Sequence, residues 1–266
     1  MPAPKNTFKQ ALRDSKPQIG LWIALANAYT AEICGGAGFD WLVIDGEHGP
    51  NDLPLLSAQL QGLAASPSHP VVRVPIGEAW LVKQVLDVGF QTVLVPMIET
   101  AEQAHAMVRA MRYPPDGMRG VGAGLARASR FNRIPDYLAS ANEEVCLLLQ
   151  IESRAGIEAL DDIAAIDGVD GVFIGPSDLA ADMGYLGKPA APDVNAVIET
   201  GIERILSHGK AAGVLTGDKS LARRYLELGA TFVAVGTDVG LLVSGSASLA
   251  ADFKRSKAHS PDGSYG

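Results

Sequence analysis

The sequence predicts a single (β/α)8 barrel, and three observations lead to that fold. Short apolar runs typical of buried strands recur eight times, and longer stretches with the apolar spacing of one-sided helices lie between them. The runs are apolar almost throughout, which indicates burial on both faces, as in parallel strands covered by helices. The chain has 266 residues, and eight strand-helix units in about 250 residues is the size of such a barrel.

The expected strands are rich in β-branched and aromatic residues, and turn residues bound most of them. In chain order they are Gly20 to Leu25, Trp41 to Ile44, Val71 to Val74, Thr92 to Met97, Cys146 to Ile151, Gly171 to Ile174, Gly213 to Thr216 and Phe232 to Val235.

The expected helices carry apolar residues three and four positions apart, the spacing that buries one face. They include Asn51 to Ala64, Trp80 to Val88, Glu102 to Met111, Val194 to His208 and Ser220 to Leu228. Glycines follow at or near the ends of several of them (Gly89, Gly209 and Gly229), where a helix C′ position favours glycine.

A doubly wound open sheet is the alternative to the barrel. A dinucleotide-binding version of it would carry G-x-G-x-x-G after the first strand. The sequence there reads I-A-L-A-N-A-Y-T, so the phosphate-binding loop is missing.

Composition limits the class of protein. The chain is 47% hydrophobic and 20% charged, as expected for one large globular domain, which we place at residues 1–253 with a polar tail at 254–266. A net charge of -8 argues against a nucleic-acid partner, which usually requires a clustered basic surface.

The N-terminus lacks the apolar stretch of a signal peptide, and no apolar run is long enough to span a bilayer. Cys34 and Cys146 form no C-x-x-C pair, so we expect both to be buried thiols in a reducing compartment. These features predict a cytoplasmic protein that does not bind membranes.

Polar side chains close neighbouring strands, and in a barrel they would meet at one mouth. Glu152 follows the fifth strand, within Q-I-E-S, and Asp178 follows the sixth, within G-P-S-D. Two carboxylates without a Cys or His cluster favour a hard divalent cation such as Mg²⁺ or Mn²⁺. Taken singly, Glu152 could be a first-turn helix carboxylate and Asp178 an N-cap.

Two further residues at this mouth suggest acid-base and anion chemistry. His48 stands three residues after Asp45, which could fix the His48 tautomer and raise its basicity, although a plain loop histidine is the alternative. Arg73 closes the apolar strand V-V-R-V-P and therefore needs an anion, either a substrate oxygen or a barrel carboxylate.

Asp87 precedes the glycine that should end a helix, where the helix dipole disfavours a negative charge. It is either a partner of the base or a solvated aspartate.

These residues lie in stretches that resemble the HpcH/HpaI aldolase family, the metal-dependent class II pyruvate aldolases of the 4-hydroxy-2-oxoheptanedioate aldolase type. The matching stretches are G-L-W-I-A-L, F-D-W-L-V-I-D-G-E-H-G-P, V-V-R-V-P, L-D-V-G-F-Q-T-V-L-V-P-M-I-E-T, R-Y-P-P-D-G-M-R-G-V-G, Q-I-E-S and G-V-F-I-G-P-S-D-L-A.

The resemblance implies a role for each residue at the mouth. Glu152 and Asp178 would bind a divalent cation (Mg²⁺, Mn²⁺ or Co²⁺), Gln150 and Ser177 would contact the substrate, Arg73 would stabilise an enolate, His48 would be the base, Asp45 and Asp87 would tune it, and Leu215 would help select the aldehyde.

The reaction implied is reversible aldol cleavage of a 4-hydroxy-2-oxo acid to pyruvate or hydroxypyruvate and an aldehyde. The resemblance also implies a homo-oligomer, typically a hexamer, with the C-terminal helix around Leu241 to Phe253 exchanged between subunits.

Two other functions compete with this one. An acyl-CoA lyase of the citrate lyase β-subunit or malyl-CoA lyase type would share the acid pair, but CoA phosphates need a basic groove and the mouth offers few lysines. A catalytically silent barrel that binds a small carboxylate would need neither a base nor a metal pair.

Overall fold

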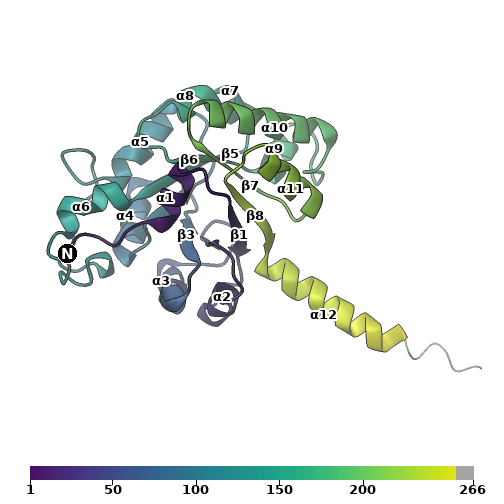
Figure 1. Cartoon of the computed structure of the whole chain (residues 1–266), viewed down its shortest axis with the longest axis horizontal. Helices are drawn as coiled ribbons and strands as arrows, with labels where there is room; N and C mark the ends of the chain where they lie inside the picture. The colour runs from purple at the N-terminus through teal and green to yellow at the C-terminus, as the bar shows by residue number, and fades with distance from the viewer. Residues whose placement is uncertain (256–266) are drawn as a thin grey trace, which may run out of the picture.

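Eight parallel strands close into a barrel in the order in which they occur along the chain (Figure 1). This computed structural model describes residues 1–255. The strands are β1 (Gln18–Ile23), β2 (Trp41–Asp45), β3 (His69–Arg73), β4 (Thr92–Val95), β5 (Cys146–Ile151), β6 (Gly171–Ile174), β7 (Ala211–Leu215) and β8 (Phe232–Thr237). The predicted fold class is therefore confirmed.

Helices follow the strands and surround the barrel (Figure 1). They are α1 (Thr7–Arg13), α2 (Ala28–Gly35), α3 (Leu53–Gly62), α4 (Ala79–Val88), α5 (Ala101–Met111), α6 (Tyr137–Glu144), α7 (Arg154–Glu158), α8 (Leu160–Ala164), α9 (Pro176–Asp182), α10 (Pro192–Ser207), α11 (Lys219–Glu227) and α12 (Asp238–Arg255), with short 3-10 turns η1 (Leu63–Ala65) and η2 (Arg127–Ser129). Gly89, Gly209 and Gly229 all have positive φ after helices, as predicted.

The strands β5 and β6 have the predicted bounds, whereas β1 ends two residues earlier than predicted. The apolar run continues through Ala24 and Leu25, but their backbone N–H groups donate to the Asp238 carboxylate and not to a neighbouring strand. A side chain that is distant in sequence, directly after β8, therefore ends β1, and local sequence does not reveal it.

Alternate residues of each strand pack into two separate layers. One set faces the helices, and the other fills the barrel interior with large rings such as Trp22, Trp41, Phe173 and Phe232. Phe8 of α1 inserts from the amino-terminal end, with its ring centroid 5.7 Å from that of Trp41. This plug leaves the carboxyl-terminal end of the strands as the open mouth.

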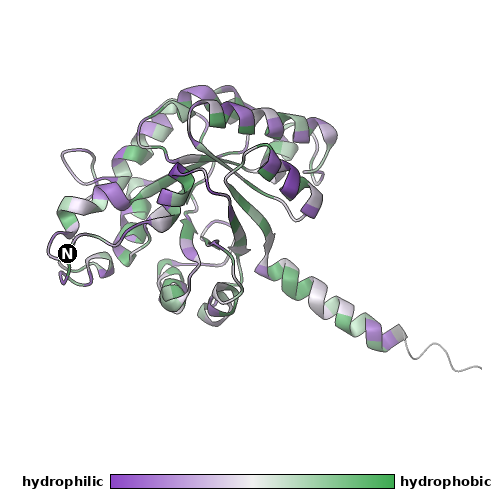
Figure 2. Ribbon diagram, viewed as in Figure 1, coloured by the Kyte–Doolittle hydropathy of each residue, from purple (hydrophilic) through white to green (hydrophobic). Residues whose placement is uncertain are grey.

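The helix α12 leaves the barrel and projects away from it (Figure 1). Figure 2 shows hydrophobic stretches, in green, along the ribbon of this helix. Five of its large apolar side chains are more than half exposed, and they are Leu241, Leu242, Val243, Leu249 and Phe253. The helix continues to Arg255, so most of the expected polar tail lies outside the described residues. Between residues 1 and 255, no helix combines the length and apolar character needed to cross a membrane.

The two cysteines differ in burial. Cys146 is fully buried, as predicted, whereas Cys34 is only half-buried. Both are free thiols.

Candidate active site

The mouth of the barrel contains a buried ion-pair network built on two adjacent strands. Asp45 ends β2, Arg73 ends β3, and the two residues are paired in register. Arg73 Nε donates to Asp45 Oδ1 at 2.9 Å, and Arg73 Nη2 donates to Asp45 Oδ2 at 2.7 Å. Of the two partners that the sequence allows for Arg73, the structure therefore shows the barrel carboxylate.

Two more side chains support this pair. Glu47 Oε2 lies 2.7 Å from Arg73 Nη1 without the alignment of a hydrogen bond. The Trp22 ring lies beneath the guanidinium, with Arg73 Cζ 4.9 Å from the ring centroid, and Trp22 Nε1 donates to Asp45 Oδ2 at 3.1 Å. Arg73 is thus held in one orientation by two carboxylates and an aromatic face.

Asp45 and Glu47, which both contact Arg73, have pKa shifts in opposite directions. Burial raises the pKa of Asp45, but the hydrogen bonds and charge of Arg73 outweigh it and leave that pKa lowered. Burial raises the pKa of Glu47, and Arg73 only partly opposes it while Asp45 and Asp178 add to it. The mouth therefore carries an excess of negative charge.

His48 lies beside this network, and its side chain is exposed. Its backbone N–H donates to Asp45 Oδ1 at 3.3 Å, but the Asp45 carboxylate is taken by Arg73 and Trp22 and does not bond to the imidazole. The expected Asp45 to His48 side-chain pairing is not formed in the chain. The ring is close enough to Glu47 to affect its pKa by charge.

Asp87 does not join the mouth of its own barrel. It lies near the end of α4, which returns the chain to the start of β4, at the opposite rim from His48. Arg119 Nη2 donates to Asp87 Oδ1 at 2.7 Å, and Arg119 itself is buried over the Tyr113 ring. Within one chain, Asp87 is an ion-pair partner of the segment that follows α5.

Glu152 lies just beyond β5 and is only 3% exposed. Gln150 Nε2 donates to Glu152 Oε2 at 2.5 Å, and the backbone N–H of Met97 donates to Glu152 Oε1 at 3.0 Å. Met97 has a positive φ of 56°, which aims its N–H at the carboxylate. The next helix is capped by Ser153, so Glu152 is not a first-turn helix residue.

The absence of a side chain at Gly175 leaves room for the Glu152 carboxylate. A Cβ at Gly175 would lie 2.5 Å from Glu152 Oε2, so only glycine fits between the end of β6 and the Glu152 side chain. Asp178 and Ser177 follow Gly175 and are exposed on the first turn of α9. Gly175 is the N-cap residue of that helix, so Asp178 is not the cap.

The charge of Asp178 affects the pKa of Glu152. Burial above all, together with the charges of Asp178 and Glu47, raises the pKa of Glu152 to about 7, although hydrogen bonds from Gln150 and Met97 oppose the shift. The predicted ligands thus lie near enough to repel each other.

The donor set fits a hard divalent cation. It consists of carboxylate oxygens whose repulsion a cation would relieve, together with Gln150 Oε1, a buried oxygen with no hydrogen-bond partner among the described residues. Across residues 1–255, no three His, Cys, Asp or Glu side chains gather closely enough to enclose an ion. Glu152 and Asp178 would therefore hold it with coordination positions left open to substrate.

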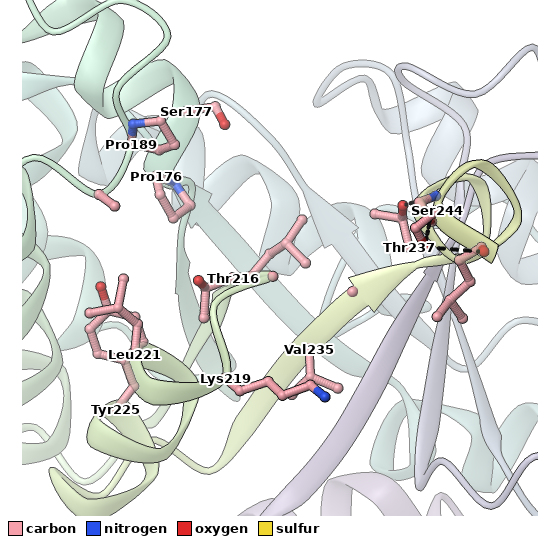
Figure 3. A pocket seen from close by; sticks show the side chains of 16 residues that line it. Pro176, Ser177, Pro189, Thr216, Lys219, Leu221, Tyr225, Val235, Thr237 and Ser244 are labelled. Atoms are coloured by element: carbon pink, nitrogen blue, oxygen red, sulfur yellow. Dashed lines mark hydrogen bonds between the residues drawn. The ribbon is translucent and has the colours of Figure 1, made fainter. Parts of the chain in front are cut away.

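A cavity of about 630 Å³ opens at the carboxyl-terminal ends of β7 and β8 (Figure 3). Ser177 and Leu215, both predicted substrate contacts, line it. Its other walls come from α11, the first turns of α12 and the Pro189 loop.

Sequence patterns missed several of the residues that shape this mouth. Trp22 looks like any core aromatic, and nothing local shows that its indole N–H faces a carboxylate. The backbone N–H of Met97 and the missing Cβ of Gly175 carry no side-chain signal. Glu47 is different, because the D-G-E-H stretch that it shares with Asp45 and His48 predicts its place at the mouth, but its pairing with Arg73 has no local signal.

Comparison with known proteins identifies a family with the same sequence pattern and fold. Residues 18–245 match the family model described as HpcH/HpaI aldolase/citrate lyase. A hydroxypyruvate/pyruvate aldolase from Agrobacterium fabrum is 60% identical over 261 residues, covering 98% of each chain. A 4-hydroxy-2-oxo-heptane-1,7-dioate aldolase from Klebsiella pneumoniae is 55% identical over 257 residues, covering 97% of each.

A solved structure also matches the fold over nearly the whole chain. The crystal structure of an HpcH/HpaI aldolase/citrate lyase family protein from Burkholderia cenocepacia superposes with a TM-score of 0.91 at 42% identity, covering 94% of this chain and all of that one. With the barrel and its mouth, these matches show that the chain belongs to the HpcH/HpaI aldolase/citrate lyase family and is a carbon-carbon lyase.

Proposed function

We propose that the chain catalyses reversible aldol cleavage of 4-hydroxy-2-oxo acids to an aldehyde and pyruvate or hydroxypyruvate. The single observation that carries this proposal is the meeting of a carboxylate pair, Glu152 and Asp178, with the fixed cation Arg73 at one barrel mouth. The near-full-length relatives named as aldolases support it over the acyl-CoA lyase alternative.

Each residue takes a defined part in the proposal. Glu152 and Asp178 hold a divalent cation such as Mg²⁺, Mn²⁺ or Co²⁺, which supplies Lewis-acid polarisation of the 2-oxo group when bound. Arg73 places its charge where negative charge grows on the oxo acid as the bond breaks. Gln150 and Ser177 orient the oxo acid, and Leu215 contacts the aldehyde portion.

In cleavage, His48 accepts the proton of the 4-hydroxyl group. The electrons of that O–H bond form the aldehyde carbonyl, the bond between C3 and C4 breaks, and its electron pair remains on the three-carbon fragment as the enolate. Protonation of C3 then gives pyruvate. Addition follows the same path in reverse.

Asp87 can tune this base only from another copy of the chain, because its own barrel holds it at the opposite rim. We therefore propose a homo-oligomer, with a hexamer as the expected state, in which α12 is exchanged between subunits. The exposed apolar side chains of α12 support the exchange because they need a covering surface. The free thiols agree with a cytoplasmic location.

The test follows the methyl protons of pyruvate by NMR in deuterated buffer. With added Mg²⁺, Mn²⁺ or Co²⁺ the protein should exchange them for deuterium, and chelation should stop the exchange. Exchange that survives complete chelation would contradict the metal-assisted enolate, and an absence of exchange and of aldol cleavage with every ion would contradict the function.

A further inference from the structure

The cavity lined by Ser177 and Leu215 has mostly apolar walls. Because both residues are placed beside the substrate in the proposed function, the space beyond them is where the far end of the aldehyde would extend. Figure 3 shows the surrounding side chains, which come from α9, α11, β8 and α12.

Most polar groups in this wall are already engaged within the chain. Thr216 Oγ1 accepts from the Asp218 N–H, Thr237 Oγ1 accepts from the Gly240 N–H, and Ser244 Oγ donates to the Gly240 carbonyl. The remaining lining is largely aliphatic or glycine and proline. These groups would accommodate a carbon chain but offer little to recognise its end.

Lys219 is the lone residue with a formal charge in the cavity wall, and it is exposed at the cavity rim. Its side chain extends from the start of α11 toward β8 (Figure 3). Among the described residues its ammonium has no ion-pair or hydrogen-bond partner. The adjacent carboxylate, Asp218, caps the helix by accepting from the N–H groups of Ser220 and Leu221 at Oδ1, and it forms no ion pair with Lys219.

We propose that Lys219 is a specificity-determining residue that pairs with an anionic group at the far end of the aldehyde. A compact ammonium on a flexible stem suits a terminal carboxylate or a phosphate equally, so the shared chemistry is a terminal anion. The cavity then favours acceptor aldehydes with an apolar or hydroxylated middle and a charged end. This inference rests on the proposed aldol function and concerns its aldehyde side alone.

The experiment compares aldol addition of pyruvate to matched acceptors, using the full-length, metal-loaded protein. Succinic semialdehyde is paired with butanal, and glyceraldehyde 3-phosphate with glyceraldehyde, so that each pair contrasts a charged with a neutral end. The readout is the ratio of kcat/KM for the charged acceptor to that for the neutral one. The variants are Lys219→Gln and Lys219→Glu, and the control is Arg223→Gln, an exposed cation on the same helix outside the cavity.

Lys219→Gln should lower this ratio roughly three- to tenfold, as expected for one partly solvated ion pair, and Lys219→Glu should lower it further. Arg223→Gln should keep the parental ratio. A fall for one anion alone identifies carboxylate or phosphate as the preferred end. Equal ratios in the parent and both Lys219 variants would overturn the inference. They would do so even if the reason is that another copy of the chain covers the cavity.

Pyruvate proton exchange separates the two levels of the proposal, because it needs no acceptor. If the parent exchanges pyruvate protons but the acceptor ratio ignores Lys219, the Lys219 assignment fails and the aldol function stands. If the parent neither exchanges protons nor joins any aldehyde to pyruvate, the function itself fails.

Discussion

Arg73 holds Asp45 through two parallel hydrogen bonds, Nε to Oδ1 at 2.9 Å and Nη2 to Oδ2 at 2.7 Å. The pair is buried, with side-chain exposures of 7% and 3%. The Asp45 carboxylate therefore orients the Arg73 guanidinium and does not form a hydrogen bond with the His48 ring. Its proposed effect on the base would act through Arg73 and through the backbone N–H of His48.

Replacing Arg73 tests whether the planar shape of the cation matters. Arg73→Lys keeps the charge but cannot hold Asp45 with two parallel bonds. We expect kcat to fall more than the KM for pyruvate rises, because the contact strengthens as the enolate forms. Steady-state kinetics decide this, and a parental kcat with only a raised KM would move Arg73 to ground-state binding.

Loss of the proposed base should be visible in cleavage. His48→Ala should lower kcat for aldol cleavage by about 10²- to 10⁴-fold, the usual effect of a lost general base. His105→Ala is the matched control, since His105 is an exposed histidine on α5. Cleavage at the parental rate by His48→Ala would show that His48 is a loop residue without a catalytic part.

The buried pair also predicts a stability effect. Asp45→Ala leaves Arg73 with a single carboxylate partner, Glu47, and should lower the free energy of unfolding by about 3 kcal/mol. Asp161→Ala breaks a more exposed pair with Arg204 and should cost below about 1 kcal/mol. Urea unfolding measures both, and equal losses would contradict the special role of the mouth pair.

The same variant gives a pH signature. Because the pKa of Asp45 is lowered in the folded protein, its contribution is present above the unfolded value of about 3.9 and is lost as the pH falls through the folded value. The stability difference between the parent and Asp45→Ala should be constant near neutral pH and shrink below about pH 4. A difference that grows in acid would assign the effect to other groups.

Much of this account could be predicted from the sequence. Continuous apolar runs define the strands, and the first carboxylate beyond such a run is expected at the mouth, which predicts the positions of Glu152 and Asp178. The choice of partner could not be read in the same way. Whether Asp45 binds His48 or Arg73 depends on the register of β2 with β3, and Trp22 becomes part of the site only once β1 closes the barrel.

The metal pair makes a prediction about the protein in chelator. Burial and the charge of Asp178 raise the pKa of Glu152 to about 7, so at pH 8 the folded protein must keep a disfavoured carboxylate ionised. Glu152→Gln removes that charge and should keep or raise the melting temperature in chelator at pH 8. A clear fall would mean that the Glu152 carboxylate stabilises the fold by itself.

Calorimetric titration of Mn²⁺ tests the central claim most directly, because it detects the ion without any reaction. The parent, Glu152→Gln, Asp178→Asn and the double variant would be compared under the same conditions. If both carboxylates hold one ion, either single change should abolish measurable binding almost as completely as the double change. Binding of Mn²⁺ with parental affinity by either single variant would show that the altered residue is not a ligand and that the proposed site is wrong.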